Sequence, residues 1–313
     1  METVQTVTDQ KKFWNGSGGR GWVEVQEVVD GMFRPFEELL VKEAAARGAQ
    51  RVLDIGCGTG GTTVALQRAL GDGAGCVGID VSGPMIEGAR ARAEREGVAA
   101  QFVQADAQSY GFETGSFDML VSRFGVMFFD DFVEAFANLR RATKPGGEMR
   151  FIAWRSPAEN PFMTTAERAA APLLPGIPAR RTDAPGQFAF SYRERVQGIL
   201  EESGWEGIAI EPLDVVCTLA VSDLDLYLGK IGPLSMALQE ADEATRAHVL
   251  GVVREAFAPY IDGEQVRYTA AVMAYRNLRR AGSRAHPRRR RAAGDRGCTG
   301  QLCQGARLSA PGF

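Results

Sequence analysis

The sequence predicts an α/β fold in which helices pack on both faces of a mostly parallel, doubly wound β-sheet. Short apolar runs alternate with amphipathic segments of helical length over residues 51–154, a pattern typical of repeated strand-helix units. A glycine-rich turn follows the first run, and an acidic residue lies at or near the end of each of the first three runs. Because parallel strands present their carboxyl ends at one edge of a sheet, we expect these acids to converge on a ligand.

The first apolar run and the turn after it read RVLDIGCGTGGTT, starting at Arg51. The turn carries glycines at alternate positions, namely Gly56, Gly58 and Gly60. Glycine lets a ligand approach the main chain closely, because no β-carbon intervenes. We expect Thr62 or Thr63 to cap the following helix, so that its first amide groups point into the loop. Cys57 is expected only to fill space in the turn.

Asp54 indicates which ligand the turn suits. A dinucleotide would place its pyrophosphate near this residue, where a carboxylate repels it in a partly dry site. A cationic ligand would be attracted instead. The residue therefore favours a ligand with a positive charge.

The second strand is predicted to end at Asp80 and the third just before Asp106. One carboxylate can accept hydrogen bonds from both hydroxyls of a ribose, so Asp80 fits a ribose-binding role. Val81 and Met85 would offer apolar contact to an adenine ring. Alternatively, Met85 only packs in the core from the helix predicted at Pro84–Glu96.

From Arg51 to Trp154 the chain resembles the class I S-adenosylmethionine-dependent methyltransferases, within their small-molecule branch. The resemblance rests on LDIGCGTG from Leu53, on the two acids that follow, and on LRRATKPGG before the fifth strand. It implies a Rossmann-like sheet of seven strands in the order 3-2-1-4-5-7-6, the last strand antiparallel, with helical lid insertions. It also implies an enzyme that uses S-adenosyl-L-methionine as its methyl donor.

The resemblance also implies roles for single residues. Asp106 would accept from the adenine amino group, and the amide of Ala107 would contact a ring nitrogen. Ser122 and Arg123, at the tip of the fourth strand, would lie beside the methionine end of the donor. Arg123 would hold the donor carboxylate or an acidic substrate, or else pair with an aspartate of the next helix, Asp130 or Asp131.

No catalytic residue is assigned, because methyl transfer from a sulfonium releases a neutral leaving group and depends mainly on positioning. Two other functions remain open. An NAD-dependent oxidoreductase would share the glycines and Asp80 but would leave Asp54 and Asp106 unexplained. A donor-binding regulatory protein without catalysis would share all of these residues.

The sequence further predicts an N-terminal helical lid segment, a catalytic domain with two insertions, and a tail. Their ranges are 1–47 for the lid segment, 48–278 for the domain, about 156–190 and 220–262 for the insertions, and 279–313 for the tail. Trp14 and Trp22 flank a flexible glycine stretch in the lid segment, where they either contact the substrate or only pin the segment. Six prolines in the first insertion disfavour a long helix and suggest a cover over the acceptor pocket. Trp154, Arg155, Asn160 and Phe162 are the candidates for its wall, or else they only anchor the loop.

The composition favours a small-molecule acceptor over a nucleic acid. The net charge of −3 combines +6 on residues 281–313 with −9 on residues 1–280, and phosphate binding needs clustered Lys and Arg. The basic tail is expected to be disordered. Five cysteines without metal-ligand spacing indicate neither a zinc site nor a disulfide framework. Without a leader-like start or a membrane-length apolar run, we expect a cytoplasmic protein without a membrane partner. The oligomeric state is not predicted.

Overall fold

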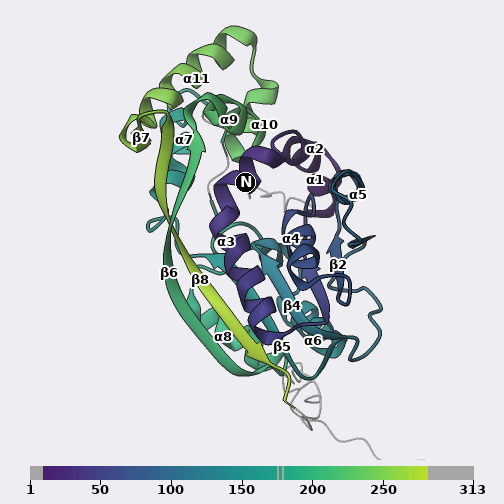
Figure 1. Ribbon diagram of the computed structural model, residues 1–313. Helices are drawn as coiled ribbons and strands as arrows, with labels where there is room; N and C mark the ends of the chain where they lie inside the picture. Colours follow the sequence, from purple (N-terminus) through teal and green to yellow (C-terminus); the bar gives the residue numbers. More distant parts are fainter. Residues whose placement is uncertain (1–9, 175, 178–179, 281–313) are drawn as a thin grey trace, which may run out of the picture.

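The computed structural model describes residues 10–174, 176–177 and 180–280, which fold around one mixed β-sheet (Figure 1). The strands are β1 (Arg51–Ile55), β2 (Gly75–Asp80), β3 (Gln101–Gln104), β4 (Phe117–Arg123), β5 (Thr143–Trp154), β6 (Glu206–Ala220), β7 (Ile261–Asp262) and β8 (Gln265–Leu278). Their order is β3-β2-β1-β4-β5-β8-β6, with the short β7 paired to β8. This confirms the predicted order, because β7 is a two-residue addition that makes the long final strand number eight.

The first five strands are parallel, whereas β8 runs antiparallel to both of its neighbours. β6 and β8 continue past the end of β5 as a long curved ribbon (Figure 1). The ribbon leads to helices α7 (Pro161–Ala170), α9 (Leu224–Lys230), α10 (Gly232–Glu240) and α11 (Glu243–Ala256). These helices form a cap beyond the carboxyl end of β5.

Helices cover both faces of the sheet, as the alternating pattern predicts. One face packs against α3 (Gln26–Arg47), α4 (Gly61–Leu70) and α5 (Gly83–Arg95). The other carries α6 (Phe132–Ala142) and α8 (Arg193–Glu202). The short helices α1 (Gln10–Asn15) and α2 (Ser17–Glu24) precede α3 and lie against α5 (Figure 1).

The glycine stretch between the first two tryptophans lies in helix α2, inside the segment predicted to be helical, and it packs too closely for larger side chains. A β-carbon on Gly19 would lie 2.6 Å from Ser82 Oγ, and one on Gly21 would lie 2.8 Å from the carbonyl oxygen of Lys230. The proline-rich cover contains the ten-residue helix α7, because Pro161 occupies its first turn, where a missing amide hydrogen costs no helical bond.

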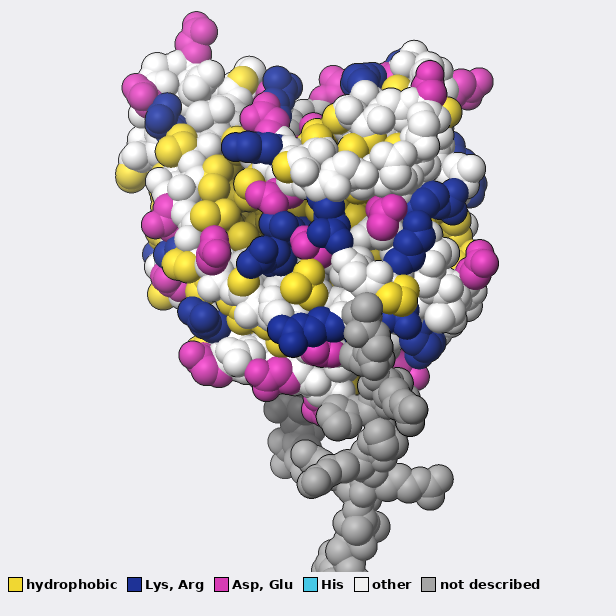
Figure 2. Space-filling model, turned by 60° about the horizontal axis from the view of Figure 1, so that its bottom comes forward, with side chains coloured by type: hydrophobic (Ala, Val, Ile, Leu, Met, Phe, Trp, Pro, Cys, Tyr) yellow, Lys and Arg dark blue, Asp and Glu magenta, His cyan; other side chains and the backbone are white. Residues whose placement is uncertain are grey.

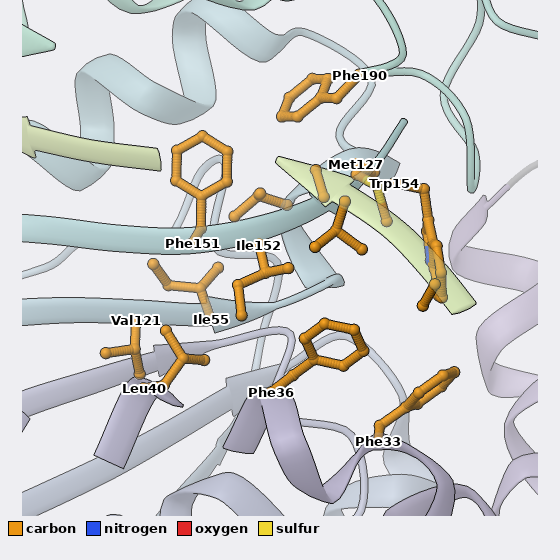
Figure 3. Packing of buried hydrophobic residues seen from close by; sticks show 14 of the residues in the cluster. Phe33, Phe36, Leu40, Ile55, Val121, Met127, Phe151, Ile152, Trp154 and Phe190 are labelled. Atoms are coloured by element: carbon orange, nitrogen blue, oxygen red, sulfur yellow. The ribbon is translucent and has the colours of Figure 1, made fainter. Parts of the chain in front are cut away.

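Aromatic side chains fill the space between α3 and the sheet. Phe33 and Phe36 point from α3 toward Trp154 at the end of β5 (Figure 3). Their ring centroids lie 5.8 and 6.4 Å from that of Trp154. This packing fixes α3 against the strands whose tips carry the predicted site.

In the described ranges, no helix is both long enough and apolar enough to cross a membrane. Residues 281–313 of the predicted tail fall outside the described residues, as do residues 1–9 of the lid segment.

Candidate functional site

The glycine turn after β1 is packed backbone against backbone. All three predicted glycines adopt left-handed φ angles, 64° at Gly56, 55° at Gly58 and 80° at Gly60. A β-carbon on Gly56 would lie 2.6 Å from the Cα atom of Gly125, in the loop after β4. The tips of β1 and β4 therefore meet with no room for a side chain between them.

Gly60 is the N-cap of α4, so the prediction that Thr62 or Thr63 caps this helix is wrong. The Thr63 hydroxyl instead donates a hydrogen bond of 2.6 Å to Oδ2 of Asp54. Asp54 is only 1% exposed, and burial raises its pKa to about 6 although the Thr63 hydrogen bond and the charge of Arg123 oppose the rise. A carboxylate so poorly hydrated favours a cationic neighbour.

Asp80 ends β2 and fixes the glycine turn. Its Oδ2 accepts from the amide of Gly58 and its Oδ1 from the amide of Ser82, each at 2.9 Å. Burial raises the pKa of this carboxyl, and the amide hydrogen bonds oppose the rise. Each oxygen keeps a lone pair for a further donor.

Asp106 follows β3 and contacts the N-terminal helices. Its Oδ2 lies 2.7 Å from Nζ of Lys11 in α1, and its Oδ1 accepts from the amide of Gln108. Ala107 is buried, and its carbonyl oxygen accepts from the Asn138 side chain. The three acids thus all lie at the carboxyl edge of the sheet, with Asp106 partly covered by α1.

The helices α1 and α2 close over the turn after β2. Ser82 Oγ donates to the carbonyl oxygen of Trp14 at 2.6 Å, and Asn15 binds both the carbonyl oxygen of Val81 and the amide of Gly83. These contacts anchor the segment directly beside Asp80.

Trp22 lies beside the glycine turn itself. A β-carbon on Gly58 would lie 4.0 Å from Trp22 Nε1 and 3.8 Å from the Met85 sulfur, with nothing closer. The Trp14 ring packs edge-on against the rings of Trp22 and Phe128, at 6.0 and 5.3 Å. Both predicted tryptophans therefore lie near the turn, and Met85 is buried in the same region.

The tip of β4 is tied to β1. Ser122 Oγ donates to the carbonyl oxygen of Ile55 at 2.7 Å and accepts from the amide of Gly125 at 3.1 Å. Phe124 precedes Gly125 in this loop and has a φ of 65°. It is the one non-glycine residue of the described ranges with a left-handed φ. A bulky residue in this conformation costs free energy, which is typical of functional loops. Its ring stacks on Trp154 at 4.5 Å.

Arg123 pairs with neither Asp130 nor Asp131. Its Nη2 donates to Oδ1 of Asp30 on α3 at 3.0 Å. Asp131 instead caps α6 by accepting from the amide of Glu134. The sequence gives no local signal for this pair, because 93 residues separate Asp30 from Arg123.

The predicted wall residues are mostly buried in packed protein. Trp154, Asn160 and Phe162 are 2%, 1% and 3% exposed. Asn160 exchanges two hydrogen bonds of 2.9 Å with the backbone of Ala271 on β8, so its amide group already has partners. The ring of Phe162 stacks on Tyr268 at 3.8 Å, and both rings line a pocket of about 340 Å³.

A family model described as a methyltransferase domain matches residues 52–147. The chain is 26% identical over 193 residues to the ubiquinone/menaquinone biosynthesis C-methyltransferase UbiE of Marinomonas sp., a match that covers 58% of this chain and 77% of the relative. It is 34% identical over 119 residues to the demethylmenaquinone methyltransferase of Thermus thermophilus, covering 38% of this chain and 54% of that one.

Among solved structures, the YcgJ protein of Bacillus subtilis matches with a TM-score of 0.52 and 20% identity, covering 79% of this chain and 98% of that one. This likeness shows the fold. The domain match and the methyltransferase relatives overturn the oxidoreductase alternative, and they agree with the three acids at the strand ends. Residues 52–147 carry a methyltransferase domain, and the relatives and the fold support a class I S-adenosylmethionine-dependent methyltransferase.

Proposed function

We propose that this enzyme transfers the methyl group of S-adenosylmethionine to a small, partly apolar acceptor. The observation that carries the proposal is the aromatic cover over the glycine turn, built by Trp14, Trp22 and Phe128. Such rings offer apolar contact area and exclude water from the place where the methyl group would be exchanged. They would leave little room for a polymer.

The residues around Gly58 fit the donor. Trp22 and Met85 line the turn, each within van der Waals reach of a β-carbon placed on Gly58. Asp80 presents two oxygens whose positions are fixed by backbone amides. We propose that Asp80 binds the ribose hydroxyls, with Val81 and Met85 against the adenine ring. Asp106 and the amide of Ala107 would bind the adenine edge, for which Asp106 must share its carboxylate with Lys11.

Bound S-adenosylmethionine supplies an electrophilic methyl group on a sulfonium sulfur. The role left to the chain is to hold the positive end of the donor, to orient it and to keep water away. We propose that the buried Asp54 supplies the counter-charge. Ser122 and Arg123 at the tip of β4 complete this end of the site, and Trp154 supports it through its stack on Phe124.

The charge distribution also favours a small acceptor. On the face drawn in Figure 2, Lys and Arg side chains alternate with Asp and Glu and with apolar patches. Binding of a nucleic acid depends on clustered cations along the phosphate path. The names of the relatives, which are C-methyltransferases of ubiquinone and menaquinone biosynthesis, support testing aromatic carbon acceptors first.

The test is a calorimetric titration with S-adenosylmethionine, S-adenosylhomocysteine and NAD, followed by transfer of a labelled methyl group to a panel of phenols, quinols, amines and thiols. We expect binding of the first two ligands only, and labelling of a small acceptor. Labelling of RNA, DNA or protein alone would refute the small-molecule acceptor. Donor binding without any turnover across the panel would favour a regulatory protein.

A further inference from the structure

A buried ion network lies beside the glycine turn and joins three elements. Asp30 of α3 accepts from Arg123 of β4 with Oδ1, at 3.0 Å. Its Oδ2 lies 2.6 Å from Nη1 of Arg92 on α5. One carboxylate therefore holds two guanidinium groups that come from either side of α4.

The network touches the site directly. A β-carbon on Gly61, the first residue of α4, would lie within 2.9 Å of both Arg92 and Asp30. In the β1–β4 register Asp54 pairs with Val121, which puts Arg123 level with Gly56 in the turn. The two arginines thus flank the amino end of a helix, where the exposed amide groups already favour an anion.

The guanidinium of Arg123 is only partly used by the protein. Its side chain is 12% exposed, and its Nη1 has no hydrogen-bond partner among the described residues. The nearest other carboxylate, that of Glu37, lies 4.0 Å from Nη1. Burial raises the pKa of Glu37, and the charge of Arg123 opposes the rise. A buried guanidinium N–H group without a partner costs free energy unless a ligand supplies the acceptor.

The donor carries a carboxylate at one end. If Asp80 and Met85 take the adenosyl end, as proposed above, the amino-acid end extends over the tips of β1 and β4. Arg123 is the arginine at that tip. Its planar fork matches a carboxylate, and the Asp30 contact leaves the Nη1 side of the fork for it.

We propose that Asp30 is a positioning residue for the donor, which holds the guanidinium of Arg123 so that its Nη1 edge receives the donor carboxylate. The inference rests on the proposed donor site, and it assigns to α3 a part in binding that its sequence does not reveal. Asp30 acts through Arg123 and does not itself touch the donor.

The test compares the affinity for S-adenosylmethionine with the affinity for its decarboxylated analogue, which keeps the sulfonium and the amine. For the unaltered protein we expect the carboxylate to strengthen binding by at least about tenfold, the effect of one charge-assisted hydrogen bond. In Asp30→Asn this preference should fall to about twofold or less, while the affinity for the analogue stays within about threefold. A merely structural role would weaken both ligands equally.

Glu43→Gln is the matched control. Glu43 lies on the same helix and also binds an arginine of a neighbouring strand, Arg150 of β5, but at the far end of α3 from the turn. Its substitution should leave the preference unchanged. Should Asp30→Asn fail to fold, Arg123→Lys keeps the charge, removes the fork and should abolish the preference in the same way.

The outcomes separate the two proposals. Binding of neither ligand by the unaltered protein would refute the donor site itself. Equal binding of both by the unaltered protein, or an unchanged preference in Asp30→Asn, would refute the role of Asp30 and leave the donor site standing.

Discussion

Replacing the buried Asp54 by asparagine should stabilise the free enzyme above pH 6 while weakening donor binding. The side chain is 1% exposed, and its pKa rises from 3.8 in an unfolded chain to about 6 in the native state, chiefly because burial penalises the charge. The unfolded chain therefore loses this proton at a lower pH than the native state does. As pH rises from about 4 to about 6, ionisation increasingly favours the unfolded state.

The size of the effect follows from the shift. About two pKa units correspond to about 3 kcal/mol of lost stability above pH 6, and to almost none near pH 4, where the native carboxyl is protonated. Asparagine cannot ionise, so the variant avoids this loss. In the variant, the Thr63 hydroxyl can still donate to the side-chain oxygen of the asparagine. The hydrogen bond of 2.6 Å that it makes with Asp54 is therefore not lost.

The assay is urea unfolding of both proteins at several pH values between 4 and 8, without donor. The stability difference between Asp54→Asn and the unaltered protein should grow by about 3 kcal/mol from pH 4 to pH 8 in favour of the variant. Thr63→Val supplies a second check, because loss of the hydrogen bond that lowers the pKa should steepen the pH dependence. A difference that stays flat from pH 4 to pH 8 would refute the reasoning.

The affinity for S-adenosylmethionine should fall by up to about tenfold per pH unit below about pH 6, because protonated Asp54 no longer offers a counter-charge. Calorimetry at pH 5 and pH 8 measures this fall. Asp54→Asn should not show it. Gly125→Ala should destabilise the protein by about 1–3 kcal/mol, because its β-carbon would lie 2.4 Å from a carbonyl oxygen of β1. Gly251→Ala, at an open position of α11, should instead stabilise by about 0.5–1 kcal/mol in the same urea assay. Asn160→Ala should lower the free energy of unfolding by about 1–3 kcal/mol, because the buried backbone groups of Ala271 lose their hydrogen-bond partners. The affinity for the donor should not change. A loss of donor binding would contradict a purely structural role for Asn160.

The fold, and the meeting of the three acids at one edge of the sheet, could be predicted because they depend on local patterns. Each strand that ends in an acid, such as β2 with Asp80, is short and apolar, and its neighbour in the sheet follows from the family order. The glycine turn is equally local, since left-handed φ angles at Gly56 and Gly58 leave few alternatives to glycine.

The remaining features depend on contacts between distant parts of the chain. Asp30 meets Arg123 and Lys11 meets Asp106 only after α1 and α3 have packed, and neither pair has a spacing rule. The burial of Asn160 could not be read from its loop-like surroundings, because its partner Ala271 on β8 lies 111 residues away. Likewise, the need for glycine in α2 depends on a distant contact, because a β-carbon on Gly21 would lie 2.8 Å from the carbonyl oxygen of Lys230.

The charges around the turn give a reason why the same site can accept the donor and release its product. Within the described residues, four carboxyl groups, those of Asp54, Asp80, Asp30 and Glu37, interact with three guanidinium groups, those of Arg34, Arg92 and Arg123. With all four carboxylates ionised, this group carries one excess negative charge. S-adenosylmethionine, with its sulfonium, ammonium and carboxylate, carries one net positive charge, whereas the product after transfer is neutral overall. Because burial makes the excess charge costly, we expect the native state to gain more from binding the donor than from binding the product.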